Sequence, residues 1–289
     1  MIIVPQPSLA DAPRRVEAVV LDWAGTTVDF GSRAPILAIL EALEQAGVPV
    51  TEQEARRPMG RAKRDHLQAL VGQPAVAQRW RRAHGRDANE ADIDRLYERF
   101  LVRQPESIVG CSGLIPGCRE AVDACRAQGI KIGSSTGYTR GLLAPVAERA
   151  RFEGYAPDVM LTADDVGPGR PAPWLCMENA KRLGVYPMQA VVKVDDTPAG
   201  VAAGRNAGAW SVGVVASGNE VGLSREAYQR LGDPQREPLL EAARRRLAKA
   251  GAQLLIDTIA ELPEAIAWVN DRLANPGRPI GPEAAAAAS

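Results

Sequence analysis

Short apolar runs, each about as long as a buried strand, recur along this chain and constrain its fold more than any other feature. Most end in Asp, Ser, Thr or Gly, and helical patterns separate the later ones. Strands that alternate with helices indicate a parallel sheet with right-handed crossover connections. The predicted strands are VEAVVLD (16–22), IKIGSST (130–136), DVMLTAD (158–164), AVVKVDD (190–196) and WSVGVV (210–215), with AQLLIDT (252–258) as a candidate sixth.

The span from 32 to 108 has helical periodicity without a convincing strand. It predicts a helical module inserted between the first strand and the rest of the sheet. We therefore expect an α/β fold: a Rossmann-like parallel sheet core at 1–31 and 109–289, and an inserted α-helical cap domain at 32–108. Helical segments are also expected at about 223–251 and 258–273.

Composition narrows the classes of function. Lys plus Arg and Asp plus Glu both number 35, which excludes a strongly basic nucleic-acid footprint. The four cysteines form no CxxC pair, so a structural zinc site is not expected. No apolar run reaches the roughly 18 to 20 residues that span a bilayer, and the start does not resemble a signal peptide. We expect a soluble cytoplasmic protein with a frayed leader and a mobile GPEAAAAAS tail.

Polar side chains gather where the predicted strands end, which is where ligands bind in open parallel sheets. Carboxylates that crowd together repel one another unless a cation is present, and an all-oxygen ligand set suits Mg²⁺. The alternative is that each acid only caps the next helix. Because several strand ends share this feature, we favour a metal site. The residues at these ends are Asp22, Thr136, Asp164, Asp165, Asp195 and Asp196.

A carboxylate beside Mg²⁺ indicates phosphoryl chemistry. Asp22 is the candidate nucleophile, because Asp can attack phosphorus and form an aspartyl-phosphate. Thr136 and Arg170 are the candidate groups that hold the phosphoryl oxygens. Gly25 and Gly137 would let the backbone come close to the ligand. Asp164 and Asp165 are possible partners of Arg170.

The order of these pieces resembles the haloacid dehalogenase superfamily of phosphotransferases. The matching segments are LDWAGTT, SSTG, Arg170 and VDDT. That superfamily usually has Lys where this chain has Arg170. Most of its phosphatases also carry an Asp, acting as general acid, where this chain has Ala24. Ala24 cannot donate a proton, although its carbonyl could still bind the metal. Either the chain is an inactive phosphatase, or its leaving group is not an oxygen that needs this acid and departs by another route.

The helical insert supplies such a route. Lys63 and His66 are three residues apart on one helix face, and Met59 precedes them. A Lys amine condenses with an aldehyde to a Schiff base. If phosphorus is bonded to the carbon beside that carbonyl, the carbon then leaves as a neutral enamine and needs no general acid.

DWAGTTVD, RRPMGRAKRDH, GSSTGYTR, DDVGPGRPAPW and GVYPM together resemble the phosphonatase family, which cleaves the carbon–phosphorus bond of phosphonoacetaldehyde in 2-aminoethylphosphonate degradation. The resemblance implies a cytosolic homodimer formed through its cap, with Mg²⁺ as cofactor. Its implied catalytic residues are Asp22 as nucleophile, Lys63 as Schiff-base former and His66 for proton transfer at the imine. Its implied metal ligands are Asp22, the carbonyl of Ala24 and Asp196, and its implied substrate-binding residues are Thr136, Gly137, Arg170, Met59 and Tyr138.

Two positions depart from that family. Ser32 stands where members can carry Cys, and Gly200 stands where some carry an acid, for which Asp195 is a possible substitute. Two rival functions stay open, a phosphate-ester phosphatase and a non-catalytic phosphate-binding regulator. Lys63 taken alone reads as a surface charge. A Schiff-base role requires a lowered pKa, which either desolvation or a nearby cation would produce, and Arg61 and Arg64 are possible cations unless they point away.

Overall fold

The computed structural model describes residues 13–275, so the predicted leader and tail lie outside the described residues. Its centre is one six-stranded sheet of order β3-β2-β1-β4-β5-β6, and every strand pair is parallel. All six predicted strands are confirmed. Their bounds are β1 Ala18–Leu21, β2 Lys131–Ser135, β3 Val159–Leu161, β4 Val191–Asp195, β5 Trp210–Val214 and β6 Leu254–Ile256.

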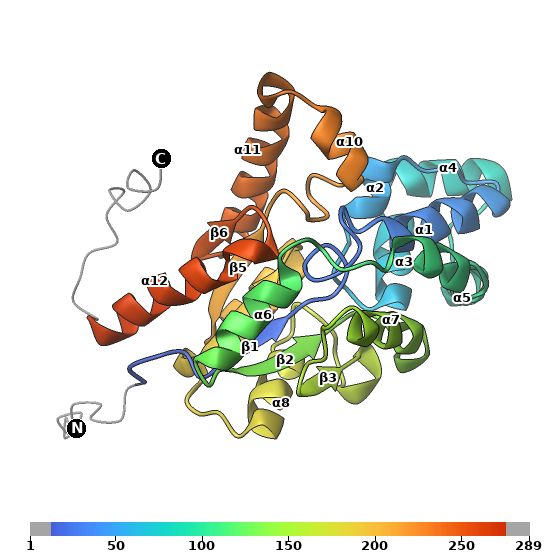
Figure 1. The fold of residues 1–289 in the computed structure, drawn as a ribbon. Coiled ribbons are helices and arrows are strands. Elements are labelled where there is room, and N and C mark those ends of the chain that lie inside the picture. Colours follow the sequence, from blue (N-terminus) through green and yellow to red (C-terminus); the bar gives the residue numbers. More distant parts are fainter. Residues whose placement is uncertain (1–12, 276–289) are drawn as a thin grey trace, which may run out of the picture.

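Helices cover both faces of this sheet (Figure 1). Val19 and Leu21 of β1 join an apolar cluster with α6 and α12, while Ala18 and Val20 face the cluster built with α8. The strands are therefore buried on both faces, which explains their continuous apolar runs. The core helices are α6 Cys118–Ala127, α7 Arg140–Phe152, α8 Trp174–Leu183, α9 Pro198–Ala207, α10 Arg225–Arg230, α11 Asp233–Lys249 and α12 Leu262–Ala274, with short 3₁₀ turns at Ala163–Asp165, Met188–Ala190 and Ile259–Glu261.

The segment predicted as one helix at 223–251 is two helices, α10 and α11. The break falls at Leu231 and Gly232, both in extended backbone. Gly232 then precedes Asp233 and Pro234, a sequence that favours the start of a new helix because Pro is tolerated in the first turn. Continuous helical periodicity did not reveal this break.

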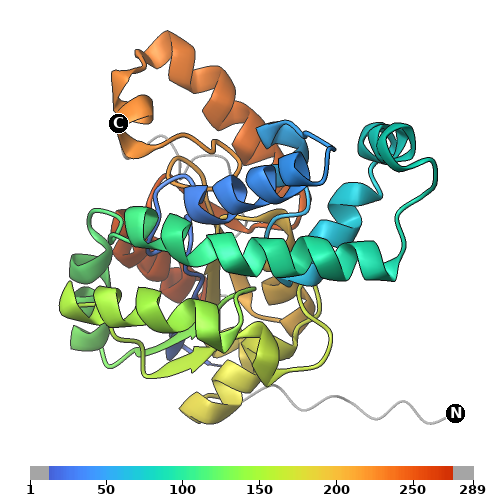
Figure 2. The same cartoon turned by 90° about the vertical axis from the view of Figure 1, so that its right-hand side faces the viewer.

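The insert is entirely helical. Its elements are α1 Arg33–Gln45, α2 Glu52–Arg56, α3 Lys63–Val71, α4 Pro74–His84 and α5 Glu90–Cys111. The long α5 packs along α1, as Figure 2 shows, and α3 also contacts α5. Because α5 continues to Cys111, the last helix of the insert passes the predicted boundary at 108. The division into cap and core at 32 and 108 stays a prediction.

A short turn joins β1 to the cap. Asp29 and Ser32 both have positive φ angles, of 56° and 49°, which residues other than glycine adopt rarely. The Asp29 carboxylate offsets the energetic cost of this strain, because its two oxygens accept hydrogen bonds from the backbone N–H groups of Arg33 and Ala34. Asp29 therefore caps the first helix of the cap from the core side.

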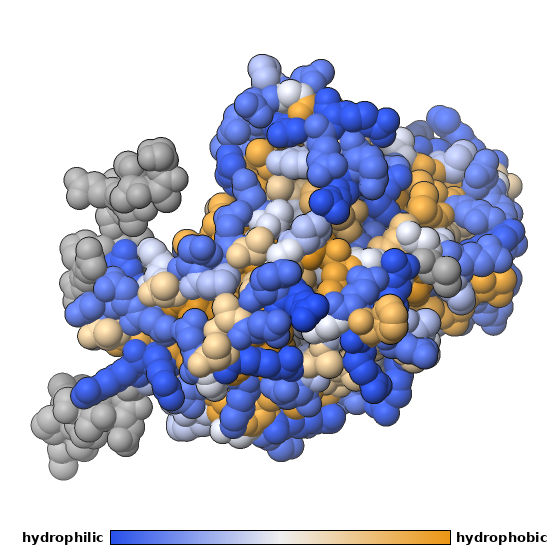
Figure 3. All heavy atoms as spheres, in the orientation of Figure 1, coloured by the Kyte–Doolittle hydropathy of each residue, from blue (hydrophilic) through white to orange (hydrophobic). Residues whose placement is uncertain are grey.

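Hydrophobic residues lie in small groups among hydrophilic ones on the face shown in Figure 3. Within residues 13–275, no helix is both long and apolar enough to cross a lipid bilayer. The main cluster of buried apolar residues includes members of the sheet, of α6 and α7, and of the cap helices α1, α3 and α5.

Phe100 on α5 is one of the largest fully buried side chains of the cap. We expect Phe100→Ala to lower the free energy of unfolding by about 3 to 5 kcal/mol, because it removes a large buried side chain and leaves a cavity. Val102 on the same helix is 73% exposed, so Val102→Ala should change stability by less than about 0.5 kcal/mol. Denaturant unfolding of both variants tests this, and equal losses would contradict it.

Candidate active site

The carboxyl ends of three adjacent strands bring the predicted polar residues together. Asp22 follows β1, Thr136 follows β2, Asp195 is the last residue of β4 and Asp196 follows it. Ligand oxygens of Asp22, Asp195 and Asp196 all lie within 4.8 Å of one another, and the three side chains are buried. For these residues the clustered arrangement predicted from sequence is present.

For Asp164 and Asp165 the helix-capping alternative describes the geometry. Asp165 accepts a hydrogen bond from the backbone N–H of Thr162, and Asp164 accepts one from the backbone N–H of Arg140. Asp165 also forms an ion pair with the Arg140 side chain at 2.7 Å. Both acids therefore contact Arg140 and not Arg170, so the expectation that they are partners of Arg170 is wrong.

The loop after β1 is shaped to admit Asp196. Gly25 has a φ of 89°, and a Cβ at this position would lie 2.1 Å from Oδ2 of Asp196. Any larger residue would push that carboxylate away. Thr26 donates a hydrogen bond to the other oxygen of Asp196 at 3.1 Å. Gly25 therefore makes room for a carboxylate, where sequence analysis had assigned it to the approach of a ligand.

Arg170 holds two of the three acids from inside the protein. Its guanidinium lies 2.7 Å from Asp22 Oδ1 and 3.2 Å from Asp195 Oδ2, and it donates to the carbonyl of Ser135 at 2.6 Å. Arg170 is buried, and its Nε atom has no hydrogen-bond partner among the described residues. A guanidinium in this position can bind a phosphoryl oxygen as well as orient the nucleophile.

Asp195 fills the space that Gly200 leaves open. A Cβ at Gly200 would lie 2.0 Å from the Asp195 carboxyl carbon, so no side chain fits there. Lys193 donates to Asp195 Oδ2 at 2.7 Å, and Thr197 donates to Oδ1 at 2.7 Å. Asp195 thus places a carboxylate beside the position where some relatives carry an acid. Sequence analysis missed Lys193, although a single Lys within the apolar run AVVKVDD was a signal.

The three acids differ in their electrostatic environment. Burial and the nearby Asp195 carboxylate raise the pKa of Asp22 to about 6. Burial and the neighbouring carboxylates also raise the pKa of Asp196 well above its usual range. Burial acts on Asp195 in the same direction, but the positive charges of Arg170 and Lys193 overcome it and lower its pKa. Asp196 is therefore the carboxylate whose charge is least compensated by the protein.

This difference bears on metal binding. Both Asp195 oxygens are already engaged by Lys193, Arg170 and Thr197, whereas Asp196 accepts from Thr26 and from backbone N–H groups and forms no ion pair with any described residue. Two buried carboxylates with raised pKa values have the chemistry of a hard-cation site, because a cation would remove their repulsion. Asp22 and Asp196 therefore fit a Mg²⁺ site, whereas Asp195 already forms ion pairs with Arg170 and Lys193.

The Lys63 amine belongs to the same cavity as the acids, although it comes from the cap. Lys63 is 6% exposed, and its Nζ lies 3.6 Å from the sulfur of Met59 and 5.3 Å from the ring centre of Tyr138. Burial, aided by the positive charge of Arg170, lowers the pKa of Lys63 to about 8. Lys63 is thus no surface charge.

Of the two cations that sequence analysis named as possible neighbours of Lys63, Arg64 points to the surface, where it pairs with Glu90 and Asp94. Arg61 lines the cavity. Burial, the other cause considered, has the largest effect on the pKa of Lys63, and Arg170 of the core is the cation that contributes most.

One small cavity is lined by groups from the cap and the core. Its free volume is about 20 Å³, close to the space that a single water needs. The predicted residues that line it are Asp22, Ala24, Met59, Lys63, Thr136, Gly137, Tyr138 and Arg170, together with Ser32, Pro35, Gly60, Arg61 and Thr197. A substrate larger than a water does not fit this volume, so we expect the cap to move away from the core before a substrate binds.

His66 lies behind Lys63 and does not line this cavity. It is fully buried, its Nε2 lies 2.8 Å from the carbonyl oxygen of Ala55, and burial lowers its pKa to about 3. The imidazole is therefore neutral. Nε2 must carry the proton because it faces a carbonyl oxygen, which leaves Nδ1 as a bare acceptor without a partner among the described residues.

Comparison with known proteins agrees with this fold. Residues 16–208 match the family of haloacid dehalogenase-like hydrolases. Curated phosphonoacetaldehyde hydrolases from Bacillus cytotoxicus and Bacillus cereus are each 43% identical, covering 88% and 87% of this chain and 97% and 96% of theirs. A crystal structure of a phosphonoacetaldehyde hydrolase like protein from Oleispira antarctica aligns with a TM-score of 0.91 at 42% identity, covering 96% of this chain and all of that one. The chain therefore belongs to the haloacid dehalogenase-like hydrolases and, among them, to the family of the phosphonoacetaldehyde hydrolases.

The buried pair of Lys193 and Asp195 gives a test of this site. Lys193→Met leaves Asp195 short of one cation, and we expect a loss of about 3 to 5 kcal/mol in the free energy of unfolding. Adding Asp195→Asn should recover part of that loss, because the uncompensated charge disappears. Denaturant unfolding of both single variants and the double variant measures the coupling. Strictly additive losses would show that the pair is not energetically linked.

Proposed function

We propose that this chain hydrolyses the carbon–phosphorus bond of phosphonoacetaldehyde to acetaldehyde and phosphate. The observation that carries the proposal is the buried Lys63 amine, which opens into the same small cavity as the Asp22 carboxylate although the two come from cap and core. Ala24 supports it as well, because a methyl group in that cavity cannot protonate an ester oxygen.

The first steps depend on Lys63. With a pKa near 8, a substantial fraction of the amine is neutral at physiological pH and can attack the aldehyde carbon. Loss of water gives a protonated imine. The carbon bonded to phosphorus then lies next to an electron sink.

Asp22 next attacks phosphorus. A phosphorus–oxygen bond forms, the carbon–phosphorus bond breaks, and its electron pair moves into the enamine as the iminium nitrogen becomes neutral. Arg170 and Thr136 would hold the phosphoryl oxygens. Mg²⁺ held by Asp22, the Ala24 carbonyl and Asp196 would neutralise part of the phosphoryl charge. Protonation of the enamine carbon and hydrolysis of the imine release acetaldehyde, and water frees phosphate from the aspartyl-phosphate.

The remaining assignments follow from position. Met59 and Tyr138 flank the amine and would keep it desolvated, and Gly137 lines the phosphoryl end beside Thr136. His66 is the proposed proton-transfer residue, since its bare Nδ1 lies one helical turn from Lys63. Cytoplasmic location and a homodimer formed through the cap stay predictions from the family resemblance.

The direct test is acetaldehyde formation from phosphonoacetaldehyde, with and without EDTA, beside a panel of phosphate esters. We expect turnover of the phosphonate only, abolished by EDTA. Lys63→Arg keeps the positive charge but cannot form the imine, so activity should fall by at least about 10³-fold. Faster hydrolysis of the esters would favour the rival phosphatase, and no phosphate release from any substrate would favour a binding protein.

Borohydride trapping reports the imine separately from turnover. Borohydride with substrate should add mass at Lys63 in the native chain and none in Lys63→Arg. The yield should rise with pH through about 8, because deprotonation creates the attacking amine. An active enzyme that gives no adduct at Lys63 would refute the imine step.

Metal binding provides a further prediction. Asp196→Asn should weaken Mg²⁺ binding by at least about 10-fold, since it removes a negatively charged ligand. Asp195→Asn is the matched control, because Asp195 is engaged by Lys193, Arg170 and Thr197, and it should change the affinity by less than about 3-fold. Calorimetry without substrate distinguishes the two, and the reverse order would move the metal to Asp195.

A further inference from the structure

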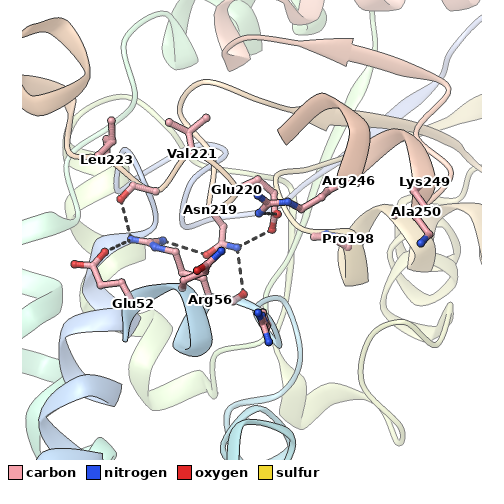
Figure 4. A pocket seen from close by; sticks show the side chains of 13 residues that line it. Glu52, Arg56, Pro198, Asn219, Glu220, Val221, Leu223, Arg246, Lys249 and Ala250 are labelled. Atoms are coloured by element: carbon pink, nitrogen blue, oxygen red, sulfur yellow. Dashed lines mark hydrogen bonds and ion pairs between the residues drawn. The ribbon is translucent and has the colours of Figure 1, made fainter. Parts of the chain in front are cut away.

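A wide groove separates the cap from the core on the side of α2. Its free volume is about 710 Å³, and both domains line it (Figure 4). The core contributes the loop between β5 and α10, residues 215–224, which we call the β5–α10 loop. Arg56 is the first residue of the segment RRPMGRAKRDH, but neither that motif nor the proposed reaction assigns a role to Arg56 or to the loop that it faces.

The β5–α10 loop supports the active site from behind. The backbone N–H of Asn219 donates to Asp196 Oδ2 at 2.7 Å, and the hydroxyl of Ser217 donates to the carbonyl of Gly25 at 3.0 Å. The first contact fixes one oxygen of the proposed metal ligand, and the second fixes the loop that carries the nucleophile. A displacement of this loop would therefore alter the position of Asp196.

Arg56 of the cap grips the same loop. Its guanidinium donates to the carbonyl of Gly222 at 2.9 Å and to the side-chain oxygen of Asn219 at 3.1 Å (Figure 4). The Asn219 amide donates back to the Arg56 carbonyl at 3.4 Å. A Cβ at Gly222 would lie 2.6 Å from Nε of Arg56, so only glycine lets the guanidinium lie this close.

The same guanidinium also reaches the turn that joins the two domains. It donates to the carbonyl of Gly31 at 2.9 Å, and Gly31 itself donates to the carbonyl of Ser217 at 2.7 Å. Glu52 accepts from both Arg56 and Arg33, which orients the two arginines. The Arg56 side chain is only 11% exposed. It therefore connects cap, connecting turn and β5–α10 loop at one point.

We propose that Arg56 is a positioning residue, a latch that closes with the cap and, through Asn219, sets the orientation of Asp196. The contacts with Asn219 and Gly222 join cap to core, so they form only when α2 lies against the core. Closing the cap thus delivers Lys63 to the cavity and, in the same movement, fixes the carboxylate on the opposite wall. The kinetic part of this proposal rests on the proposed function, whereas the binding and exchange measurements below need no turnover.

The decisive variant is Arg56→Gln, with Arg57→Gln as its matched control. Arg57 is the next residue in the chain and lines the same groove, but it is exposed, and its hydrogen bond to Gln73 at 3.4 Å stays within the cap. We expect Arg56→Gln to speed amide hydrogen exchange in the β5–α10 loop by about 10-fold and to weaken Mg²⁺ binding by about 3- to 10-fold. Arg57→Gln should leave both unchanged. Circular dichroism confirms that both variants fold.

Kinetics add a second readout. A weakened latch lowers the closed population, so Arg56→Gln should lower kcat/KM for phosphonoacetaldehyde, and Arg56→Lys should restore only part of it, because one ammonium cannot span Gly31 and Gly222 together. If Arg56→Gln does not fold, Asn219→Ala tests the same link from the core side and should give the same exchange and Mg²⁺ effects. Arg56 is only a structural anchor if the variant loses thermal stability while its loop exchange and Mg²⁺ affinity match those of Arg57→Gln.

Discussion

The site depends on burying three carboxylates within 4.8 Å of one another, an arrangement that repulsion opposes. Two protein cations make it possible. Arg170 bridges Asp22 and Asp195, and Lys193 pairs with Asp195 from within β4. Among the described residues neither of these two cations forms an ion pair with Asp196, and Lys63 of the cap acts on Asp196 only at longer range. That difference explains why Asp196 rather than Asp195 has the free binding capacity expected of a metal ligand.

The same charges reach across the domain boundary to Lys63. Burial and Arg170 lower the pKa of its amine, while Asp22 and Asp196 raise it, and the balance falls at about 8. A fully exposed lysine would stay protonated at neutral pH, whereas an amine buried without the acids would have a still lower pKa. The Asp22 carboxylate of the core therefore helps to set the pKa of the Lys63 amine, which belongs to the cap.

The sequence predicted the sheet well because strands buried on both faces read as continuous apolar runs, whose carboxyl ends must share one edge. Asp22, Thr136 and Asp196 became candidate site residues for that reason. Lys63 became a candidate because Ala24 cannot act as a general acid, so the leaving group would need another route. The roles of Lys193 and Asn219 were not identified, since the first depends on a carboxylate that turns back over Gly200. The second depends on a contact with Arg56, 163 residues earlier in the chain, and such pairings leave no periodic signal.

The division of the reactive groups between two domains also affects when water can enter the cavity. In the proposed reaction, imine formation releases one water, and hydrolysis of the imine and of the aspartyl-phosphate each consume one. The closed cavity has room for about one water, so it cannot hold the substrate together with the water that these steps need. Cleavage of the carbon–phosphorus bond, in contrast, gains from excluding water, because the enamine and the acyl phosphate both form where few waters can intercept them. A cap that opens between these stages satisfies both requirements. The proposed latch suits such a cap, because its partners in the core are neutral carbonyl and amide groups. The acid that pairs with Arg56, Glu52, lies on the same helix α2, so separating cap and core does not require that ion pair to break.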